Sequence, residues 1–179
     1  MTQQNTYGYL KTFSALDANE QVSRDYRQAQ MRALWNRLLA GFRRGQALAD
    51  FSQATSGARI AARHEIGVRQ VPLERVRGSV GRSGDFDRTF MPLQKHTRGR
   101  WLQVDRAFRE GEPLSPVELY QVGEDYYVVD GHHRLSVAAL HGQRYVEARV
   151  TRVELGRKAP DAGVGMTAAN GLRFAACHA

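Results

Sequence analysis

A short run of ionisable residues lies where an apolar segment meets a helix-forming one. Tyr126–Val129 favours a β-strand, and the sequence then reads DGHHR, from Asp130 to Arg134, before an apolar stretch that ends near Leu140. The first turn of a helix has unpaired backbone N–H groups and the positive end of the helix dipole, so it favours an anion. Because cations are disfavoured at that end, the two His and the Arg indicate a bound phosphate.

Each residue of this run has a role in such a site. Gly131 lets a phosphate approach the backbone closely, and Arg134 can hold two of its oxygens. His132 and His133 can donate hydrogen bonds, and Asp130 could hold Mg²⁺ or a ribose hydroxyl. The sequence therefore predicts a nucleotide-phosphate site.

Three other interpretations use the same residues. Asp130 could only cap the helix, with the basic side chains in solvent. A zinc site needs three or four ligands, but His132 and His133 point about 100° apart on a helix and only His141 is near in sequence. A catalytic triad could be drawn with Ser136, but nothing in the sequence would activate that hydroxyl.

Arginine dominates the positive charge of the chain. Lys and Arg number 26 against 18 Asp and Glu, for a net charge of +8, and 23 of the 26 are Arg. Residues 59–109 carry 12 bases and 5 acids, whereas residues 110–151 carry 3 bases and 7 acids. This asymmetry indicates a basic face for a polyanion, with nucleic acid first, although a GC-rich genome also raises the Arg content.

The N-terminal third reads as one amphipathic helix. Asp17 and Glu20 have the spacing of a capping box, so we expect the helix to run from Asp17 to about Phe51, with a break near Gly41 or Gly45. Residues 1–16 read as a flexible lead. The apolar positions of one expected packing stripe are Val22, Tyr26, Met31, Leu34, Trp35, Leu38 and Phe42.

The rest of the chain alternates strand and helix signals. Residues 52–59 read as a linker, and Gly123-Glu124-Asp125 predicts a hairpin turn. The expected strands are Val71–Val76, Val117–Val122, Tyr126–Val129 and Tyr145–Val153, and the expected helices are 98–110 and His132–Leu140. We divide the chain into a lead and helix (1–58), an α+β core (59–153) and a flexible tail (154–179).

Composition excludes several classes of protein. No window approaches 18 uninterrupted apolar residues, which argues against a membrane span. The N-terminus lacks a basic start followed by an apolar run, so we expect a cytoplasmic protein. A single cysteine, Cys177, excludes a disulfide scaffold and a cysteine-rich zinc site.

The DGHHR segment and its surroundings resemble a known superfamily. VVDGHHRLSVAALHG, preceded by PVELYQVGEDYY and followed by the strand Tyr145–Val153, resembles the core of the ParB/sulfiredoxin superfamily, over roughly residues 70–153. VPLERVRGSVGRSGDFDRTFMPL is similar to the start of a ParB-like domain. The resemblance implies a small ParB/sulfiredoxin-like α+β core, here with an N-terminal helical extension, that binds nucleotide phosphates at the strand–helix turn.

Two activities of this superfamily do not fit the residues. Sulfiredoxins use a Gly-Cys-His-Arg motif, and His132 stands where that redox Cys would be, while Cys177 lies in the expected tail. Chromosome-partitioning ParB proteins follow the core with two further domains, for which the residues after Val153 are too few. We therefore expect neither activity.

The resemblance to the free-serine kinases of the superfamily is closer. Those enzymes depend on a glutamate in a loop near the first strand. Here the loop at residues 77–82 has no acid, Glu74 lies upstream inside the expected strand, and the next acids are Asp85 and Asp87. Either aspartate could serve as a general base or a metal ligand, with Arg82 and Arg88 holding it ionised. Asp85 could equally be a turn residue after Gly84.

The expected function is that of a ParB-like nucleotide-binding protein, acting with nucleic acid; the alternative is a kinase of a small metabolite. The residues leave open whether the protein is an enzyme and whether it forms a homodimer. We expect CTP or ATP with Mg²⁺ as the ligand and no membrane partner. The candidate catalytic residues are Asp85, Asp87 and His132; the candidate nucleotide-binding residues are Ser79, Gly81, Arg82, Asp130, Gly131, His132, His133 and Arg134; the candidate metal ligand is Asp130.

Overall fold

The structure, a computed structural model, describes residues 5–40, 48–56 and 58–156. Its helices are α1 (Asn5–Ala40), α2 (Phe51–Ala54), α3 (Arg98–Arg109) and α4 (His132–Leu140), with short 3-10 turns at Leu73–Arg75 and Lys95–Thr97. Its strands are β1 (Ala49–Asp50), β2 (Arg59–Pro72), β3 (Val76–Ser79), β4 (Val117–Val122), β5 (Asp125–Asp130) and β6 (Tyr145–Gly156). The expected α+β class with an N-terminal helix is confirmed.

The six strands form one mixed sheet in the order β1-β3-β5-β4-β6-β2. The predicted hairpin joins β4 to β5 as antiparallel neighbours, whereas β3 runs parallel to β5 and β4 parallel to β6. Parallel neighbours need a crossover: the chain passes through α3 and β4 between β3 and β5, and through β5 and α4 between β4 and β6. The carboxyl end of β5 therefore continues directly into α4.

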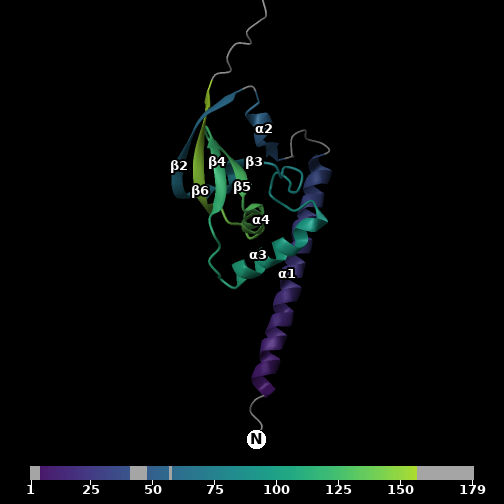
Figure 1. The fold of residues 1–179 in the computed structure, drawn as a ribbon. Coiled ribbons are helices and arrows are strands. Elements are labelled where there is room, and N and C mark those ends of the chain that lie inside the picture. The colour runs from purple at the N-terminus through teal and green to yellow at the C-terminus, as the bar shows by residue number, and fades with distance from the viewer. Residues whose placement is uncertain (1–4, 41–47, 57, 157–179) are drawn as a thin grey trace, which may run out of the picture.

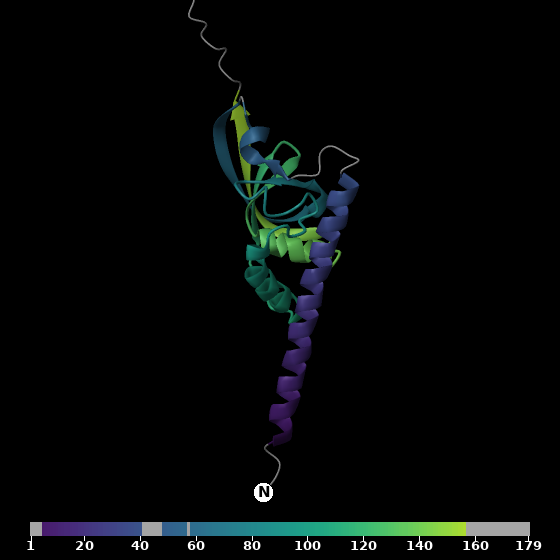
Figure 2. The same ribbon diagram turned by 90° about the vertical axis from the view of Figure 1, so that its right-hand side faces the viewer.

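Helix α4 packs between the sheet and the other helices (Figures 1 and 2). Leu135 and Ala138 belong to the main apolar cluster, which they share with sheet residues such as Leu119 and Val128. Val137, on another side of α4, packs in a second cluster with Trp101 of α3 and with α1. The indole of Trp101 also donates a buried hydrogen bond to Ser136 Oγ at 2.8 Å. These contacts fix the position of α4 on both sides.

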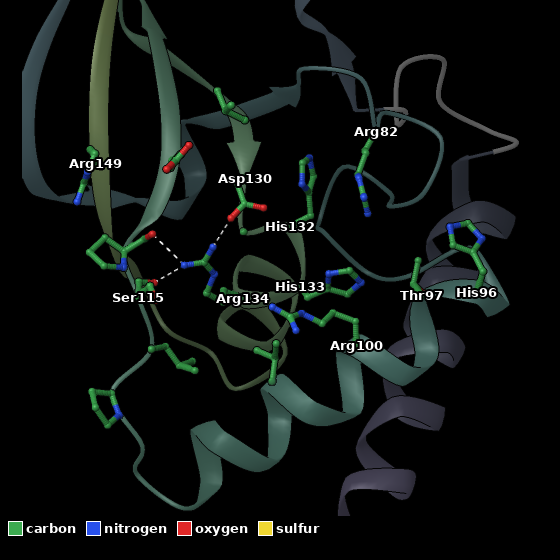
Figure 3. A pocket seen from close by; sticks show the side chains of 17 residues that line it. Arg82, His96, Thr97, Arg100, Ser115, Asp130, His132, His133, Arg134 and Arg149 are labelled. Carbon is green, nitrogen blue, oxygen red and sulfur yellow. Dashed lines mark hydrogen bonds and ion pairs between the residues drawn. The ribbon is translucent and has the colours of Figure 1, made fainter.

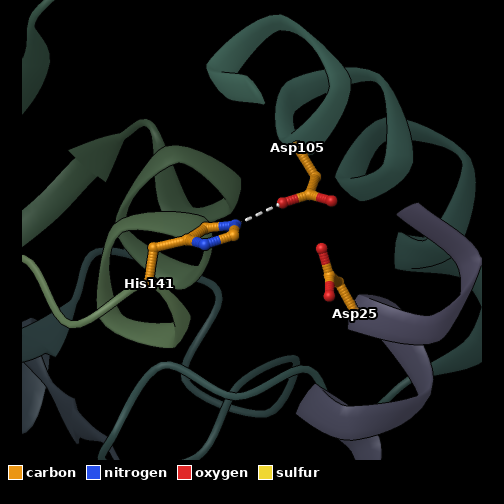
Figure 4. A group of neighbouring side chains, drawn as sticks. All are labelled: Asp25, Asp105 and His141. Carbon is orange, nitrogen blue, oxygen red and sulfur yellow. Dashed lines mark hydrogen bonds and ion pairs between the residues drawn. The ribbon is translucent and has the colours of Figure 1, made fainter. Parts of the chain in front are cut away.

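An ionic cluster fastens α1 to α3 and to the end of α4 (Figure 4). Arg109 of α3 pairs with Asp25 of α1, its Nε at 2.8 Å from Oδ2. Asp105, fully buried, accepts a 2.7 Å hydrogen bond from His141. Burial raises the pKa of Asp105, and the hydrogen bond to His141 opposes that effect. Arg109 also lies 3.6 Å from Asp105 Oδ2, so one guanidinium group pairs with both carboxylates.

Two expectations about the N-terminal helix are wrong. The helix begins at Asn5, so part of the expected lead is helical, and Asp17 and Glu20 are exposed residues within it rather than a capping box. The expected packing stripe is also divided, because Val22 and Tyr26 are buried against the domain whereas Met31, Leu34, Trp35 and Leu38 are exposed. Helix α1 ends at Ala40; the expected breaks at Gly41 or Gly45, and Phe42, lie outside the described residues.

Two further expectations concern the start of the sheet. Val71–Val76 is not one strand, because β2 ends at Pro72, a 3-10 turn follows, and β3 begins at Val76. β2 was missed because it is an edge strand paired only with β6. Most of its residues are exposed or half-buried, so its sequence lacks the regular apolar alternation of an inner strand. Residues 52–59 are not simply a linker, since they include most of α2 and the first residue of β2.

The remaining predicted elements are confirmed. Helices 98–110 and His132–Leu140 and the strands at 117–122, 126–129 and 145–153 agree with the structure within a few residues. The part of the tail beyond Gly156, with Cys177, lies outside the described residues. None of the helices in the described ranges has the length and apolarity needed to span a bilayer.

Gly131, between β5 and α4, allows a direct test of this arrangement. It has a φ of 98°, and a Cβ there would lie 2.6 Å from Val117 Cγ1, whereas Gly142 has a φ of 73° with open space around it. Gly142→Ala should therefore lose about 1–2 kcal/mol from backbone strain alone, and Gly131→Ala roughly 3 kcal/mol or more because the overlap adds to the strain. Urea unfolding of both variants measures the difference, and equal losses would contradict the close approach.

Candidate functional site

A cavity of about 790 Å³ opens in front of the N-terminus of α4 (Figure 3). It is bounded by the turn after β3, the start of α3, the segment that leads into β4, and the β5–α4 turn. Its lining residues are Arg82, His96, Thr97, Arg100, Val104, Pro113, Leu114, Ser115, Pro116, Glu118, Val129, Asp130, Gly131, His132, His133, Arg134 and Arg149. All five residues of the DGHHR run predicted from the sequence thus line this cavity.

The β5–α4 turn presents its backbone to this cavity. Gly131 has the left-handed conformation that glycine adopts without strain, and it is the N-cap of α4. A glycine has no side chain to cap the helix, and no side-chain cap is present. The first N–H groups of α4 are consequently left for another acceptor, as an anion site requires.

The guanidinium of Arg134 is already engaged by the protein. Its Nη1 donates to the carbonyl oxygens of Ser115 and Pro116, and its Nη2 donates to Asp130 Oδ2 at 2.6 Å. These bonds tie α4 to the segment before β4 and neutralise Asp130. The residue expected to hold phosphate oxygens is therefore first of all a positioning residue in this structure.

Three other arginines face the cavity with uncommitted guanidinium groups. Arg82 comes from the turn after β3, Arg100 from the first turn of α3 and Arg149 from β6. Within the described ranges, none of these three guanidinium groups forms an ion pair with an acid. The cavity therefore combines a helix N-terminus with cations that lack a counter-ion, which favours a bound anion.

His132 joins α4 to the turn that carries Arg82. Its Nε2 lies 2.7 Å from Ser79 Oγ, and the backbone N–H of Arg82 donates to the same oxygen at 3.1 Å. Burial, and then the positive charge of Arg82, lower the pKa of His132 to about 4. The imidazole is therefore neutral at pH 7, and its Nε2 shares a hydrogen bond with the hydroxyl group of Ser79. Ser79 is fully buried, so this pair positions the turn.

His133 differs from His132 in having an unused ring nitrogen. Its Nε2 is buried, and no hydrogen-bond partner for it exists among the described residues. Burial, followed by the charges of Arg82 and Arg100, lowers the pKa of His133. A buried polar atom without a partner costs free energy unless a ligand or water satisfies it. His133 lines the cavity beside Arg100 (Figure 3), so a ligand there can reach it.

The two candidate aspartates have different surroundings. Asp87 is buried and fully engaged: its Oδ1 accepts from Thr89 N, Thr89 Oγ1 and Met91 N, each at 2.8 Å, and its Oδ2 accepts from Asn36 of α1. Asp85 is less constrained, with His96 Nε2 3.5 Å from its Oδ1. Of the two, only Asp85 has a carboxylate left for chemistry, and neither lines the cavity.

Asp130 is the candidate metal ligand. Its side chain is exposed and pairs with Arg134. Among the described residues, the one group of three His, Asp or Glu side chains with converging ligand atoms is Asp25, Asp105 and His141, away from Asp130. Asp130 alone could still contribute to Mg²⁺ carried by a nucleotide, since such ions keep several waters and phosphate ligands.

Sequence reasoning missed part of the cavity. Arg100 and Arg149 were not singled out, and neither were His96 and Thr97, because these residues reach the cavity from elements distant in the chain. Arg149 comes from β6, which is parallel to β4 and pairs Arg149 with Glu118. Because side chains alternate along a strand, the sequence of β6 could have placed Arg149 on one face of the sheet. No local pattern predicts that α3 lies beside the DGHHR segment. Gly81, with a φ of 94°, shapes the turn before Arg82 and does not line the cavity.

The hydrogen bonds of Asp87 predict a structural role. Asp87→Ala would leave the buried N–H of Met91 without a partner and would remove the hydrogen bond from Asn36 of α1, so we expect a loss of about 2–4 kcal/mol in the free energy of unfolding. Asp85→Ala, the matched control in the same loop, should lose less than about 1 kcal/mol. Chemical denaturation of both variants tests this, and a larger loss in Asp85→Ala would refute the assignment.

The lowered pKa of His132 predicts a pH dependence of stability. The pKa of His132 in the folded state is below its unfolded value of about 6.5, so the unfolded state binds more protons as the pH falls from 6.5 to 4. The free energy of unfolding therefore decreases over that pH range. His132 should contribute roughly 3 kcal/mol of this loss, and His133 adds to it in the same direction.

Urea unfolding between pH 7 and pH 4 measures this contribution. We expect His132→Gln to be less stable at pH 7 and to have a shallower slope, whereas His64→Gln, at an exposed site, should keep the slope of the wild type. Identical slopes for wild type and His132→Gln would show that His132 is not held neutral.

Comparisons with known proteins add one solved structure. No family model matches the chain, and no curated protein matches its sequence. The fold is similar to that of sulfiredoxin from Arabidopsis thaliana, at 19% identity and a TM-score of 0.36, over 51% of this chain and 88% of that chain. At these values we take no activity and no residue role from that protein.

Proposed function

We propose that this protein binds a nucleotide through its phosphates in the cavity at the N-terminus of α4. The observation that supports this most strongly is the set of Arg82, Arg100 and Arg149 around an uncapped helix N-terminus. A nucleotide satisfies the free N–H groups and the uncompensated charge together. The buried Nε2 of His133 gains a partner as well.

The size of the cavity supports a nucleotide over a bare phosphate ion. About 790 Å³ is within the usual range for small-molecule sites. Its walls also include apolar surface from Val104, Leu114 and the nearby prolines, against which a base or ribose can pack. Asp130 is available at the rim for Mg²⁺ or a ribose hydroxyl, as the sequence suggested. CTP and ATP remain the expected ligands.

We further propose that the bound form acts with nucleic acid. The net charge of +8 and the predominance of Arg support an interaction with a polyanion. This part of the proposal predicts retention on DNA that weakens steeply as the salt concentration rises, because phosphate contacts release counterions. If the protein does not bind DNA at low salt, the nucleic-acid part of the proposal is wrong, while the proposal of a nucleotide site is unaffected.

A second candidate function, phosphorylation of a small metabolite, depends on Asp85. Asp85 has the less constrained carboxylate of the two aspartates. It lies beside His96, which lines the cavity. If Asp85 is a general base, nucleotide turnover should require a small hydroxyl-bearing acceptor and should be lost in Asp85→Asn with nucleotide affinity retained. Turnover that is equal in the presence and absence of acceptors would exclude this function.

Calorimetric titration with ATP, ADP, CTP and GTP, with and without Mg²⁺, tests the nucleotide site. We expect Arg100→Ala and Arg82→Ala to weaken the preferred nucleotide roughly ten- to hundredfold, the usual effect of losing a charged hydrogen bond. Arg69→Ala, an exposed arginine on β2, should bind like the wild type. Arg134→Ala is a less specific probe, because it also removes bonds that hold α4.

Two results would contradict the proposal. One is no binding of any of these nucleotides to the wild type at millimolar concentration. The other is binding that Arg100→Ala and Arg82→Ala weaken no more than Arg69→Ala does, which would place the ligand elsewhere on this basic protein.

A further inference from the structure

Helix α1 has two apolar faces, of which the fold uses one. Val22, Tyr26, Ala29 and Ala33 are buried against the domain. On the opposite face of the helix, five large apolar side chains are 50–62% exposed: Met31, Leu34, Trp35, Leu38 and Leu39. A contiguous exposed apolar surface of this kind on a globular protein marks an interaction site.

The sequence of α1 contains a heptad pattern, with spacings that alternate between three and four residues. In the first half of α1 the positions are Leu10, Phe13, Asp17 and Glu20, and in the second half they are Arg24, Arg27, Met31 and Leu34. Such spacing keeps one seam of residues along a helix that pairs with another helix. From Asp17 onward, every one of these side chains is exposed.

The seam is complementary to itself when it is read in the opposite direction. Two positions correspond when their residue numbers add up to 44, which pairs each residue of the first half with one of the second half. The pairs are Leu10 with Leu34, Phe13 with Met31, Asp17 with Arg27, and Glu20 with Arg24. Apolar residues thus meet apolar residues, and acids meet bases, along about 36 Å of helix.

We propose that two copies of this chain associate through α1 in antiparallel orientation. The two-fold axis passes at the level of residue 22, midway between the two symmetry-related Glu20–Arg24 pairs, and the interface is the same surface on both copies, as in most homodimers. The apolar pairs lie toward the two ends of the seam. The ionic pairs at its centre set the register and the orientation.

Charge excludes the parallel arrangement of the same helices. In a parallel pair, Arg24 would face Arg24, Arg27 would face Arg27, and the acids would likewise face acids. Within one copy, Glu20 and Arg24 form an exposed ion pair at 2.6 Å. An exposed pair of this kind contributes little free energy, so its exchange for pairs across the interface costs little.

The position of α1 in the molecule leaves the seam accessible. The domain contacts α1 through α3, on the side of Tyr26 and Ala33. In both views α1 lies along one side of the molecule, and its N-terminal half extends beyond the rest of the ribbon (Figures 1 and 2). A helix that lacks tertiary packing is marginally stable in water, and a second copy supplies that packing.

Sedimentation equilibrium of the full chain tests the association. We expect a monomer–dimer equilibrium that Leu34→Glu weakens roughly 100-fold or more, because each dimer then buries two unpaired carboxylates. Val68→Glu, at an equally exposed apolar residue of β2, should dimerise like the wild type. A wild type that stays monomeric at all concentrations would overturn the proposal, and so would a Leu34→Glu protein that dimerises normally.

Charge reversal tests the ionic centre. Glu20→Arg should weaken the dimer because it places arginines opposite each other, and the double variant Glu20→Arg/Arg24→Glu should restore it. Both variants change only exposed side chains, so circular dichroism at pH 7 should confirm that the domain remains folded. Failure of the double variant to recover dimerisation would rule out this pairing.

Disulfide crosslinking tests the orientation. In a Cys177→Ser background with oxidised glutathione as the oxidant, Asp17→Cys protein mixed with Arg27→Cys protein should give a covalent dimer. Each variant alone should give little, because equal positions are ten residues out of register. Crosslinking of each variant with itself, and not of the mixture, would establish a parallel dimer and contradict the proposal.

Discussion

The candidate site depends on the fixed position of α4. Leu135 packs into the core on the sheet, and Val137 packs against the helices, so that the helix cannot shift toward either layer without opening an apolar cluster. Its first turn is held in addition by the bonds of Arg134 and by the contact between His132 and Ser79. A helix fixed in this way presents its N–H groups to the cavity without reorganisation when a ligand binds, and such preorganisation favours affinity.

The basic residues around the cavity have two roles: some hold the protein together, and others are left to attract a ligand. The guanidinium group of Arg134 binds Asp130 and backbone carbonyl oxygens. Burial and the neighbouring arginines lower the pKa of both histidines of DGHHR, which disfavours their charged forms. The positive charge that remains for a ligand therefore comes from the arginines outside the motif. The motif builds the frame of the site, and elements distant in the sequence provide much of its electrostatic attraction.

Sequence reasoning predicted the features that depend on local interactions and missed those that depend on residues far apart in the chain. The α4 segment, α3 and the β4–β5 hairpin were predicted because their signals are local: an Asp-Gly turn, an apolar face, a glycine after a helix. The hydrogen bond between Asp87 and Asn36 was not predictable, since the two residues are 51 positions apart. Arg100 and Arg149 were missed for the same reason. The two faces of α1 were merged into one stripe because spacing alone does not show which face meets the domain.

The central claim is that a nucleotide binds by its phosphates at the N-terminus of α4. Amide NMR of the ¹⁵N-labelled protein during titration with the preferred nucleotide tests this residue by residue. We predict that the largest shifts occur at the backbone amides of residues 131–134 and at the imidazole of His133, whose pKa rises when an anion lies beside it. Shifts confined to other surfaces, with these amides and the His133 ring unchanged, would contradict the account.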